Sequence, residues 1–241
     1  MYDLHCHFLP DIDDGPMSMS DSLAMAQHAI NAGITHSVLT PHLHLGRYEN
    51  FNEGIKNAFN EFKSQLKSNN LNLALGYAAE VRVCPDIMTW LSEDKIPFLG
   101  NYEGYKILLL DMPHKHIPSG IDNLVHWLIL KNIRPMIAHP ERNKEIMANP
   151  LKIKPLINSG ALLQLTAGAV AGEFGEKCYQ TSNYILENGL ATILASDAHN
   201  LKHRPPELES GRKRAENVIG ESKSWDLVLN TPKKITAVQF T

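Results

Sequence analysis

The feature that most constrains this chain is an alternation of seven short apolar runs with segments of helical periodicity. The apolar runs, which we predict to be strands, are 2–5, 37–40, 73–79, 106–110, 135–138, 162–165 and 191–195. Because helices separate successive strands, the strands should run parallel and be joined by right-handed crossovers. No Gly-rich dinucleotide turn marks a reversal of strand order, so a closed or nearly closed barrel is favoured over an open sheet. No long linker or internal repeat interrupts the chain, and we expect residues 1–241 to form a single α/β domain.

Apolar residues at helical spacing predict the segments between the strands. The clearest stripe lies on one face of a single helix and comprises Phe51, Ile55, Ala58, Phe59, Phe62 and Leu66. A helix over about 20–32 should stop at Gly33, a residue type typical of the position just past a helix C-terminus. Further helices are expected through 121–128 and over 207–218, the latter polar and on the outside.

Six of the seven predicted strands deliver a His, Asp or Glu at their carboxyl end. In the first strand, His5 and His7 share one face while Leu4, Cys6 and Phe8 share the other. The later strands lead into His42, Glu80, Asp111, His139, Asp197 and His199, and Asp14 follows in the loop after the first strand. Barrel enzymes build their sites at this end of the strands.

Each of these residues alone has an ordinary structural reading. Residues 13–15 read as a turn, and Asp197 could cap a helix. Five histidines and four carboxylates buried together without a counter-charge would be very costly, however. The joint pattern therefore predicts metal binding.

The ligand types limit the metal. Imidazole and carboxylate together suit Mn, Fe or Zn, and the lack of thiolates argues against structural zinc or an iron–sulfur cluster. Nine ligands exceed the needs of one ion, so we expect two to three divalent ions, with Mn or Fe favoured and Mg, Zn or Co as alternatives. Shared in this way, the ligands leave open positions for water and substrate. Glu80, in the middle of the mouth, is the expected bridge between two ions.

Two arginines flank the predicted metal site. Arg142 follows His139 by three residues, and Arg204 follows His199 by five. Three divalent cations would outweigh the four carboxylates, so a chain of net charge −3 can still offer a cationic pocket to an anion. A guanidinium binds phosphate oxygens at two points. Arg47 is a third candidate, although it reads more readily as a surface residue.

Composition narrows the classes of function and the cellular location that the chain could have. Charged residues make up 20% of the chain, so no broad basic face indicates nucleic acid or an anionic membrane. No apolar run approaches the roughly 20 residues of a membrane span, and no signal-peptide pattern opens the chain. Cys6, Cys84 and Cys178 are odd in number and lack CxxC spacing, which argues against a disulfide framework and indicates the cytoplasm.

Several motifs together resemble one known superfamily. They are MYDLHCHFLPDIDDG at 1–15, TPH at 40–42, AAE at 78–80, AHPER at 138–142 and ASDAHN at 195–200. In this order and spacing they resemble the polymerase-and-histidinol-phosphatase (PHP) superfamily. The chain is most similar to its bacterial protein-tyrosine phosphatases from capsule and exopolysaccharide operons, and the likeness continues through HRPP at 203–206 to TPKKI at 231–235.

This resemblance implies a distorted TIM-like (β/α)7 barrel with a three-metal site. The family's ligands fall on His5, His7, Asp14, His42, Glu80, Asp111, His139, Asp197 and His199. Its catalytic arginine falls on Arg142, and its second phosphate-binding arginine falls on Arg204. The family usually has glutamate where Asp111 stands. The shorter side chain predicts weaker binding of one ion or a closer approach of the backbone.

The resemblance also implies an activity, that of a metal-dependent phosphoric monoester hydrolase acting on phosphotyrosine in proteins. The implied partner is the tail of an autophosphorylated bacterial tyrosine kinase that controls capsular or exopolysaccharide synthesis. Divalent ions lower the pKa of water so that it attacks phosphorus near neutral pH, while Arg142 and Arg204 bind the nonbridging oxygens. Cysteine-based tyrosine phosphatases instead carry Arg six residues after their nucleophile. The residues six after the three cysteines are Ile12, Trp90 and Tyr184, which excludes that chemistry.

Three other functions stay open at this point. The protein could hydrolyse a small metabolite such as histidinol phosphate, and the rim loops at 43–50, 112–119 and 168–178 would decide between the two substrates. A metal-dependent amidohydrolase would often carry a bridging lysine at a strand end, but 110–112 reads Leu-Asp-Met. A metalloprotein that binds phosphopeptides without turnover is the non-enzymatic alternative.

Overall fold

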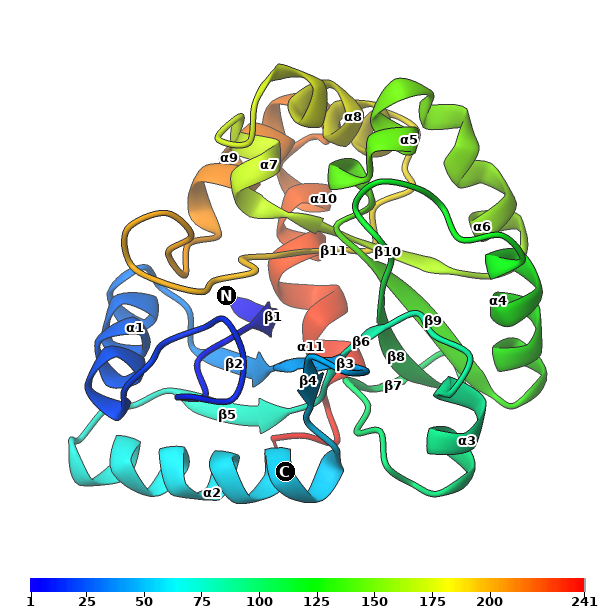
Figure 1. Ribbon diagram of the computed structural model, residues 1–241. Coiled ribbons are helices and arrows are strands. Elements are labelled where there is room, and N and C mark those ends of the chain that lie inside the picture. The colour runs from blue at the N-terminus through cyan, green and yellow to red at the C-terminus, as the bar shows by residue number, and fades with distance from the viewer. Residues whose placement is uncertain (241) are drawn as a thin grey trace.

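A ring of parallel strands lies at the centre of the molecule, with helices packed around it (Figure 1). This is a computed structural model, and it describes residues 1–240. The strands are β1 (Tyr2–Cys6), β2 (His36–Leu39), β3 (His42–His44), β4 (Tyr48–Glu49), β5 (Ala74–Tyr77), β6 (Glu80–Arg82), β7 (Gly100–Tyr102), β8 (Tyr105–Asp111), β9 (Ile133–Ala138), β10 (Leu162–Thr166) and β11 (Ile193–Ala195). The helices are α1 (Met19–Asn31), α2 (Asn52–Ser68), α3 (Ile87–Ser92), α4 (Ile121–Leu130), α5 (Lys144–Ala148), α6 (Lys154–Asn158), α7 (Ala167–Ala171), α8 (Glu176–Glu187), α9 (Glu209–Ile219), α10 (Glu221–Trp225) and α11 (Thr231–Ile235).

The ring consists of two hydrogen-bonded sheets that meet at two places. One sheet has the order β1-β2-β5, and the other runs β11-β10-β9-β8-β6-β3-β4. They meet first where β3 and β6 continue the paths of β2 and β5, each after two intervening residues. They meet again where the end of β1 pairs with the segment after β11. There the His7 N–H donates to the Ala198 carbonyl and the Asp197 N–H donates to the His5 carbonyl, both at 2.8 Å.

The seven predicted strands are confirmed, with ends shifted by at most two residues. They follow one another around the ring in chain order, as the predicted distorted barrel requires. The short pair β3 and β4, the short strand β6 and the antiparallel strand β7 were not predicted, because two or three residues carry too little periodicity. For β7 a local signal did exist. Glu103 and Gly104, both with positive φ, form the two-residue turn that joins β7 to β8.

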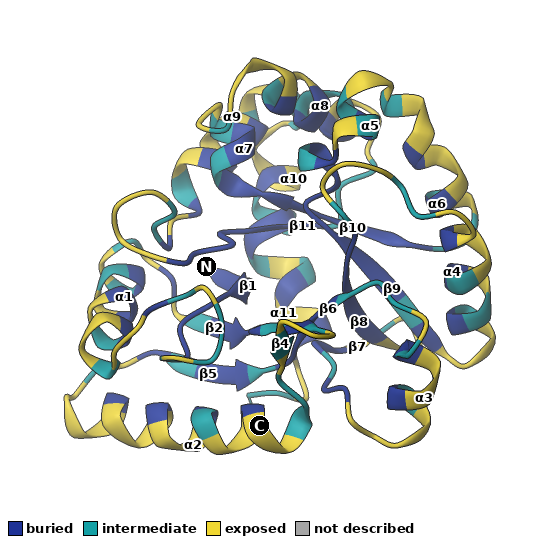
Figure 2. Ribbon diagram, viewed as in Figure 1, coloured by how far each residue is buried: buried dark blue, intermediate teal, exposed yellow. Residues whose placement is uncertain are grey.

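The predicted helices are also present. α1 is N-capped by Ser18, whose side chain accepts a hydrogen bond from the Asp21 N–H, and Gly33 follows its end with φ +81°. α2 buries Ile55, Phe59, Phe62 and Leu66 as the stripe predicts. Figure 2 shows that the outer faces of the helices are exposed while the strands are buried. Among residues 1–240, no helix combines the length and apolar character needed to cross a membrane.

Apolar side chains fill the inside of the ring below a polar layer. Ile107 and Leu109 lie on the same strand face as Asp111, because alternate residues of a strand point the same way. Ala78 precedes Glu80 by two residues and belongs to the same buried cluster. The strands therefore carry apolar residues toward the bottom of the ring and polar residues at its mouth, where their carboxyl ends lie.

Candidate active site

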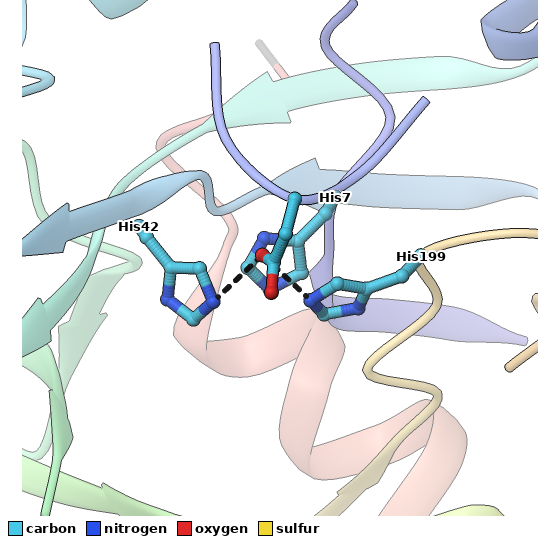
Figure 3. Close-up of side chains that lie close together, drawn as sticks. His7, His42 and His199 are labelled. Atoms are coloured by element: carbon cyan, nitrogen blue, oxygen red, sulfur yellow. Dashed lines mark ion pairs between the residues drawn. The ribbon is translucent and has the colours of Figure 1, made fainter. Parts of the chain in front are cut away.

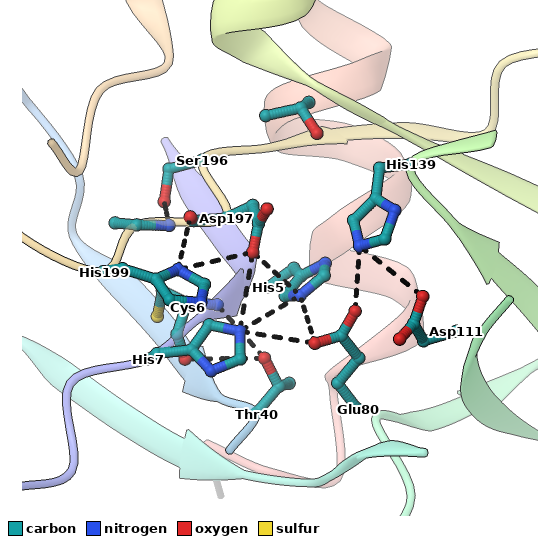
Figure 4. Close-up of polar contacts among 12 residues, drawn as sticks. His5, Cys6, His7, Thr40, Glu80, Asp111, His139, Ser196, Asp197 and His199 are labelled. Atoms are coloured by element: carbon teal, nitrogen blue, oxygen red, sulfur yellow. Dashed lines mark hydrogen bonds and ion pairs between the residues drawn. The ribbon is translucent and has the colours of Figure 1, made fainter. Parts of the chain in front are cut away.

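The nine predicted metal ligands converge at the mouth of the ring, although they come from segments spread over the whole chain. Figure 4 labels all of them except Asp14 and His42, and Figure 3 labels His42. Three groups of them have ligand atoms within 4.8 Å of one another. The groups are His7, Asp14, His42 and His199; His5, His7 and Glu80; and His42, Glu80 and Asp111. His139 and Asp197 lie outside these groups but contact their members, as described next.

Glu80 lies at the centre of this cluster. Its Oε2 is 2.7 Å from His42 Nδ1 and 3.4 Å from His5 Nε2, and its Oε1 is 2.9 Å from His139 Nε2. From the other side, Asp197 Oδ1 is 3.3 Å from His5 Nε2. With His7 Nε2 also 3.5 Å from Oε2, Glu80 contacts four imidazoles through two different oxygens, which is the geometry that a bridging carboxylate needs.

The group at the outer edge of the cluster is open to solvent. Figure 3 shows the rings of His7, His42 and His199 around a common point. Asp14 Oδ1 lies 3.1 Å from His42 Nε2 and 3.4 Å from His199 Nε2. The Asp14 side chain is 39% exposed, whereas those of Glu80 and His5 are fully buried, so the loop carrying Asp14 forms the outer wall of the site.

Two further residues orient the imidazoles, and neither was selected from the sequence. Asp13 Oδ2 accepts a hydrogen bond from His7 Nδ1 at 2.6 Å, and Gln164 Oε1 lies 2.9 Å from His5 Nδ1. Gln164 Oε1 also accepts the His139 N–H at 3.2 Å, which identifies that atom as the amide oxygen. With Nδ1 protonated in this way, the Nε2 lone pairs of His5 and His7 face the cluster.

Both residues left some trace in the sequence. Gln164 is a polar side chain within the apolar run Leu-Leu-Gln-Leu-Thr, and a polar residue inside a predicted buried strand is a signal that could have identified it. Asp13 stands beside Asp14 in a turn motif, and only the folded loop shows that Asp14 reaches the mouth while Asp13 turns toward His7.

Asp111 has two differently placed oxygens. Its Oδ2 forms an ion pair with Arg82 Nη2 at 3.0 Å, and its Oδ1 faces the cluster, 3.9 Å from His139 Nε2. The shorter side chain therefore still points one oxygen at the candidate metal position while the other is held by Arg82.

Burial and crowding shift the pKa values in the cluster. Burial and then the neighbouring Glu80 carboxylate raise the pKa of Asp111 to about 7. Burial alone would lower the pKa of His42, but Glu80 and Asp14 outweigh it and raise the pKa to about 9. Burial and then Arg142 lower the pKa of His139 to about 4. Divalent cations favour ionised carboxylates and neutral imidazoles, so metal binding would displace protons from Asp111 and His42.

Three buried atoms of the cluster lack hydrogen-bond partners of normal geometry among the described residues, in the way expected of a cation site. Glu80 Oε2, Asp111 Oδ1 and His199 Nε2 are buried and make no hydrogen bond of normal geometry within residues 1–240. All three are lone-pair donors, and leaving such atoms unpaired is costly unless something positive satisfies them. Oxygen and nitrogen donors of this kind suit Mn, Fe and Zn.

The backbone is constrained at two of the nine positions. His139 and Asp197 are non-glycine residues with φ of 32° and 52°. Residues in this region cost free energy and persist where the surrounding structure needs the side chain in one direction. Both follow the end of a strand, so the turn directs His139 and Asp197 back over the mouth.

The two predicted phosphate-binding arginines lie together at the Asp197 side of the cluster. Arg142 Nη1 and Arg204 Nη1 both donate to Asp197 Oδ2, the latter at 3.0 Å. Their side chains are 20% and 23% exposed, so both remain accessible from the mouth. Arg47 lies elsewhere, on the exposed β3–β4 hairpin, with its guanidinium 4.8 Å from the Tyr48 ring centre.

The cysteines take no part in this site. Cys6 is fully buried in the apolar core, and its thiol lies 3.6 Å from the Val38 carbonyl, on the opposite strand face from His5 and His7. Burial and then Asp3 raise the pKa of Cys6 well above its usual value, and burial raises that of Cys178 to about 12. The predicted core position of Cys6 is confirmed, and neither thiol is poised as a thiolate nucleophile.

Comparisons with known proteins agree with this geometry. The family described as capsular polysaccharide synthesis, CpsB/CapC, matches residues 1–237. The chain is 35% identical to the tyrosine-protein phosphatase YwqE of Bacillus subtilis over 204 residues, covering 85% of this chain and 79% of that protein. It is 30% identical to the tyrosine-protein phosphatase CpsB of Streptococcus pneumoniae over 247 residues, covering 100% of both. A crystal structure from work on YwqE and CpsB, described as unique metal-dependent tyrosine phosphatases, superposes with a TM-score of 0.91 at 32% identity, covering 99% of this chain and 95% of that one.

Proposed function

This chain belongs to the CpsB/CapC family of capsular polysaccharide synthesis, and we propose from that premise that it is a metal-dependent protein-tyrosine phosphatase. One structural observation carries the proposal. Nine imidazole and carboxylate side chains converge at the mouth of the ring, with buried lone-pair atoms that make no hydrogen bond of normal geometry within residues 1–240, beside two accessible arginines. Such a site supports hydrolysis of a phosphomonoester, since it combines cation binding with phosphate binding.

We assign the nine converging residues as metal ligands. They are His5, His7, Asp14, His42, Glu80, Asp111, His139, Asp197 and His199. Three overlapping groups of ligand atoms support two to three divalent ions, with Mn or Fe favoured. Glu80 belongs to two of these groups, and its carboxylate has two oxygens, so it would be the ligand available to two neighbouring ions.

The remaining roles follow from where the side chains lie. The divalent ions, when bound, supply positive charge and acidify water enough for attack on phosphorus near neutral pH. Arg142 and Arg204 are the catalytic pair that binds the nonbridging phosphoryl oxygens and stabilises the charge that develops on them. Phe174, from the rim loop at 168–178, lies under Arg142, with 5.2 Å between the guanidinium and the ring centre, and supports its orientation. The departing phenolate has a pKa of about 10, so it needs less proton donation than an alkoxide.

The proposed protein substrate is the phosphotyrosine tail of a bacterial tyrosine kinase that acts in capsular or exopolysaccharide synthesis. The family's link to capsular polysaccharide and the relatives' tyrosine-phosphatase activity support this assignment. A partly exposed mouth, with Asp14 at 39% side-chain exposure, suits a flexible polypeptide better than a deep slot would. We place the reaction in the cytoplasm and in the single domain formed by residues 1–241.

A substrate panel tests this proposal. The purified protein, after its metal content has been measured, should release phosphate from phosphotyrosine peptides with a higher kcat/KM than from histidinol phosphate or other small phosphomonoesters. Chelation should abolish release, and Mn or Fe should restore it best. Equal or faster turnover of histidinol phosphate would favour a metabolite phosphatase. Tight phosphopeptide binding without phosphate release would favour a binding protein instead.

A further inference from the structure

A cationic hollow adjoins the candidate active site beside Asp111 and His139. It has a volume of about 460 Å³, and its polar lining comprises His44, Arg82, His114, Lys115 and His116. No Asp or Glu of residues 1–240 lines it. The residues come from β3, from β6 and from the rim loop after β8, segments that flank the mouth.

The hollow makes direct contact with the site. Arg82 Nη2 pairs with Asp111 Oδ2 at 3.0 Å, and the His114 ring stacks on the His139 ring with 5.8 Å between centres. In Figure 4 Asp111 lies at one end of the labelled cluster, and Asp197 lies on the other side of His5 and Glu80 from it. Arg82 thus contacts the cluster at Asp111, while Arg142 and Arg204 contact it at Asp197. A polypeptide whose phosphotyrosine enters the site could thus reach the hollow within one to three residues, since an extended chain advances about 3.3 Å per residue.

The loop that carries His114, Lys115 and His116 is held in place by α5. Asn143 Nδ2 donates to the carbonyls of Pro113 at 2.8 Å and His116 at 3.0 Å, and the Lys144 N–H donates to the His114 carbonyl at 2.8 Å. Asn143 is itself 3% exposed and caps α5 through its side-chain oxygen. These bonds fix the loop before any substrate binds, which lowers the entropy cost of using it as a binding surface.

We propose that this hollow binds the carboxylate of an acidic residue that flanks the phosphotyrosine in the substrate polypeptide. This inference rests on the proposed function. Arg82 is already partly neutralised by Asp111, while the exposed Lys115 forms no ion pair within the described residues. The positive charge that remains on Arg82 and Lys115 suits a carboxylate, with its single negative charge, better than it suits a second phosphate. The enzyme is therefore selective for phosphotyrosine in an acidic context.

Matched peptides test the inference on the metal-loaded enzyme. Each pair places Glu or Gln at one position within three residues of the phosphotyrosine. We expect kcat/KM to be about three- to fivefold higher for the Glu peptide at the best position, which is the range of a partly exposed ion pair, and the ratio should shrink at high salt. Lys115→Gln should bring the ratio close to one, Lys115→Glu should invert it, and Lys115→Arg should preserve it.

Lys131→Gln is the control, because it removes the same charge from an exposed residue just before β9, at the opposite end of the ring. This variant should keep the wild-type ratio. Three results would each overturn the inference. The first is a wild-type Glu-to-Gln ratio of one at every position, and the second is an equal loss of the ratio in Lys131→Gln. The third is a preference for a second phosphotyrosine but not for Glu.

A binding measurement separates this inference from the proposed function. Labelled peptides with a non-hydrolysable phosphonate in place of the phosphate should show the same Glu-to-Gln ratio in their dissociation constants, measured by fluorescence anisotropy. Turnover without a charge preference would refute the hollow alone. Absence of turnover for all peptides would refute the phosphatase, and the anisotropy ratio would still decide whether the hollow binds carboxylate.

Discussion

Replacing Asp13 with asparagine should weaken metal binding without removing any ligand. The Asp13 side chain is 1% exposed, and its two oxygens have three donors to satisfy. Oδ2 accepts from His7 Nδ1 at 2.6 Å and from the His42 N–H at 3.0 Å, and Oδ1 accepts from the Gly15 N–H at 2.9 Å. Asparagine has only one acceptor oxygen. If that oxygen faces His7 and His42, its NH₂ group meets the Gly15 N–H, and a buried donor loses its partner.

The surrounding loop leaves little room to relax. A Cβ on Gly15 would lie 2.8 Å from the His7 carbonyl oxygen, so this turn packs directly against the backbone that carries His7. Changes to residues that orient metal-bound histidines cost about 10- to 100-fold in affinity. That range equals about 1.4–2.7 kcal/mol, since each tenfold step is about 1.4 kcal/mol. His7 belongs to two of the three candidate ligand groups, so we expect the upper part of this range.

Competition of the protein with a chromophoric chelator for Mn measures this affinity. Asp11→Asn is the matched control, since it changes the same charge in the same loop at an exposed position. Asp11 makes no side-chain hydrogen bond within residues 1–240, and asparagine tolerates its φ of 58°. Thermal unfolding in excess chelator reports any general loss of stability. An affinity of Asp13→Asn within twofold of both wild type and the control would refute the orienting role of Asp13.

Three further substitutions test other parts of the molecule. Arg142→Ala should lower kcat by about two to three orders of magnitude, as expected for one lost donor to the developing charge, and a near-normal kcat would contradict its role. Asp111→Glu should retain metal equally or more tightly in equilibrium dialysis, because the longer side chain reaches further past Arg82. Weaker retention would mean that the backbone has adapted to aspartate. Asn143→Asp keeps the cap of α5 but loses the hydrogen-bond donors to the Pro113 and His116 carbonyls. Urea unfolding should therefore show a free energy of unfolding lower by about 1–2 kcal/mol, and a protease should cut residues 112–117 faster than in wild type. Wild-type protease resistance would show that the loop is held by other contacts.

The sequence predicted the long-range architecture better than the local detail of the site. Apolar runs such as 106–110 identify buried strands because burial demands a continuous stretch of apolar side chains. Polar residues directly after those runs, such as Glu80 and His139, must then gather at one end of the ring. The residue roles assigned to the nine ligands and two arginines stay predictions, although their convergence is now visible.

Other features depended on geometry that sequence patterns do not carry. Asp13 and Asp14 are chemically identical neighbours, and only the path of their loop decides which one faces the mouth. The pairing of Arg82 with Asp111 joins residues 29 positions apart across the β6–β8 register, where Arg82 lies opposite Asp111. The hollow at Lys115 likewise depends on Asn143, whose amide donates to carbonyls about thirty residues earlier in the chain.

The pairing of the first strand's end with the segment after the last strand has a consequence for biosynthesis. His5 and His7 leave the ribosome about 190 residues before Asp197 and His199, which must be made before they can join them, and the closing bond runs between His7 and Ala198. A nascent chain that lacks Asp197 and His199 therefore holds only part of the cage, and closure of a loop of about 190 residues precedes full loading with cations. Cations that prefer the finished cage would then stabilise the closed ring, and they could do so only after the segment carrying Asp197 and His199 has been made.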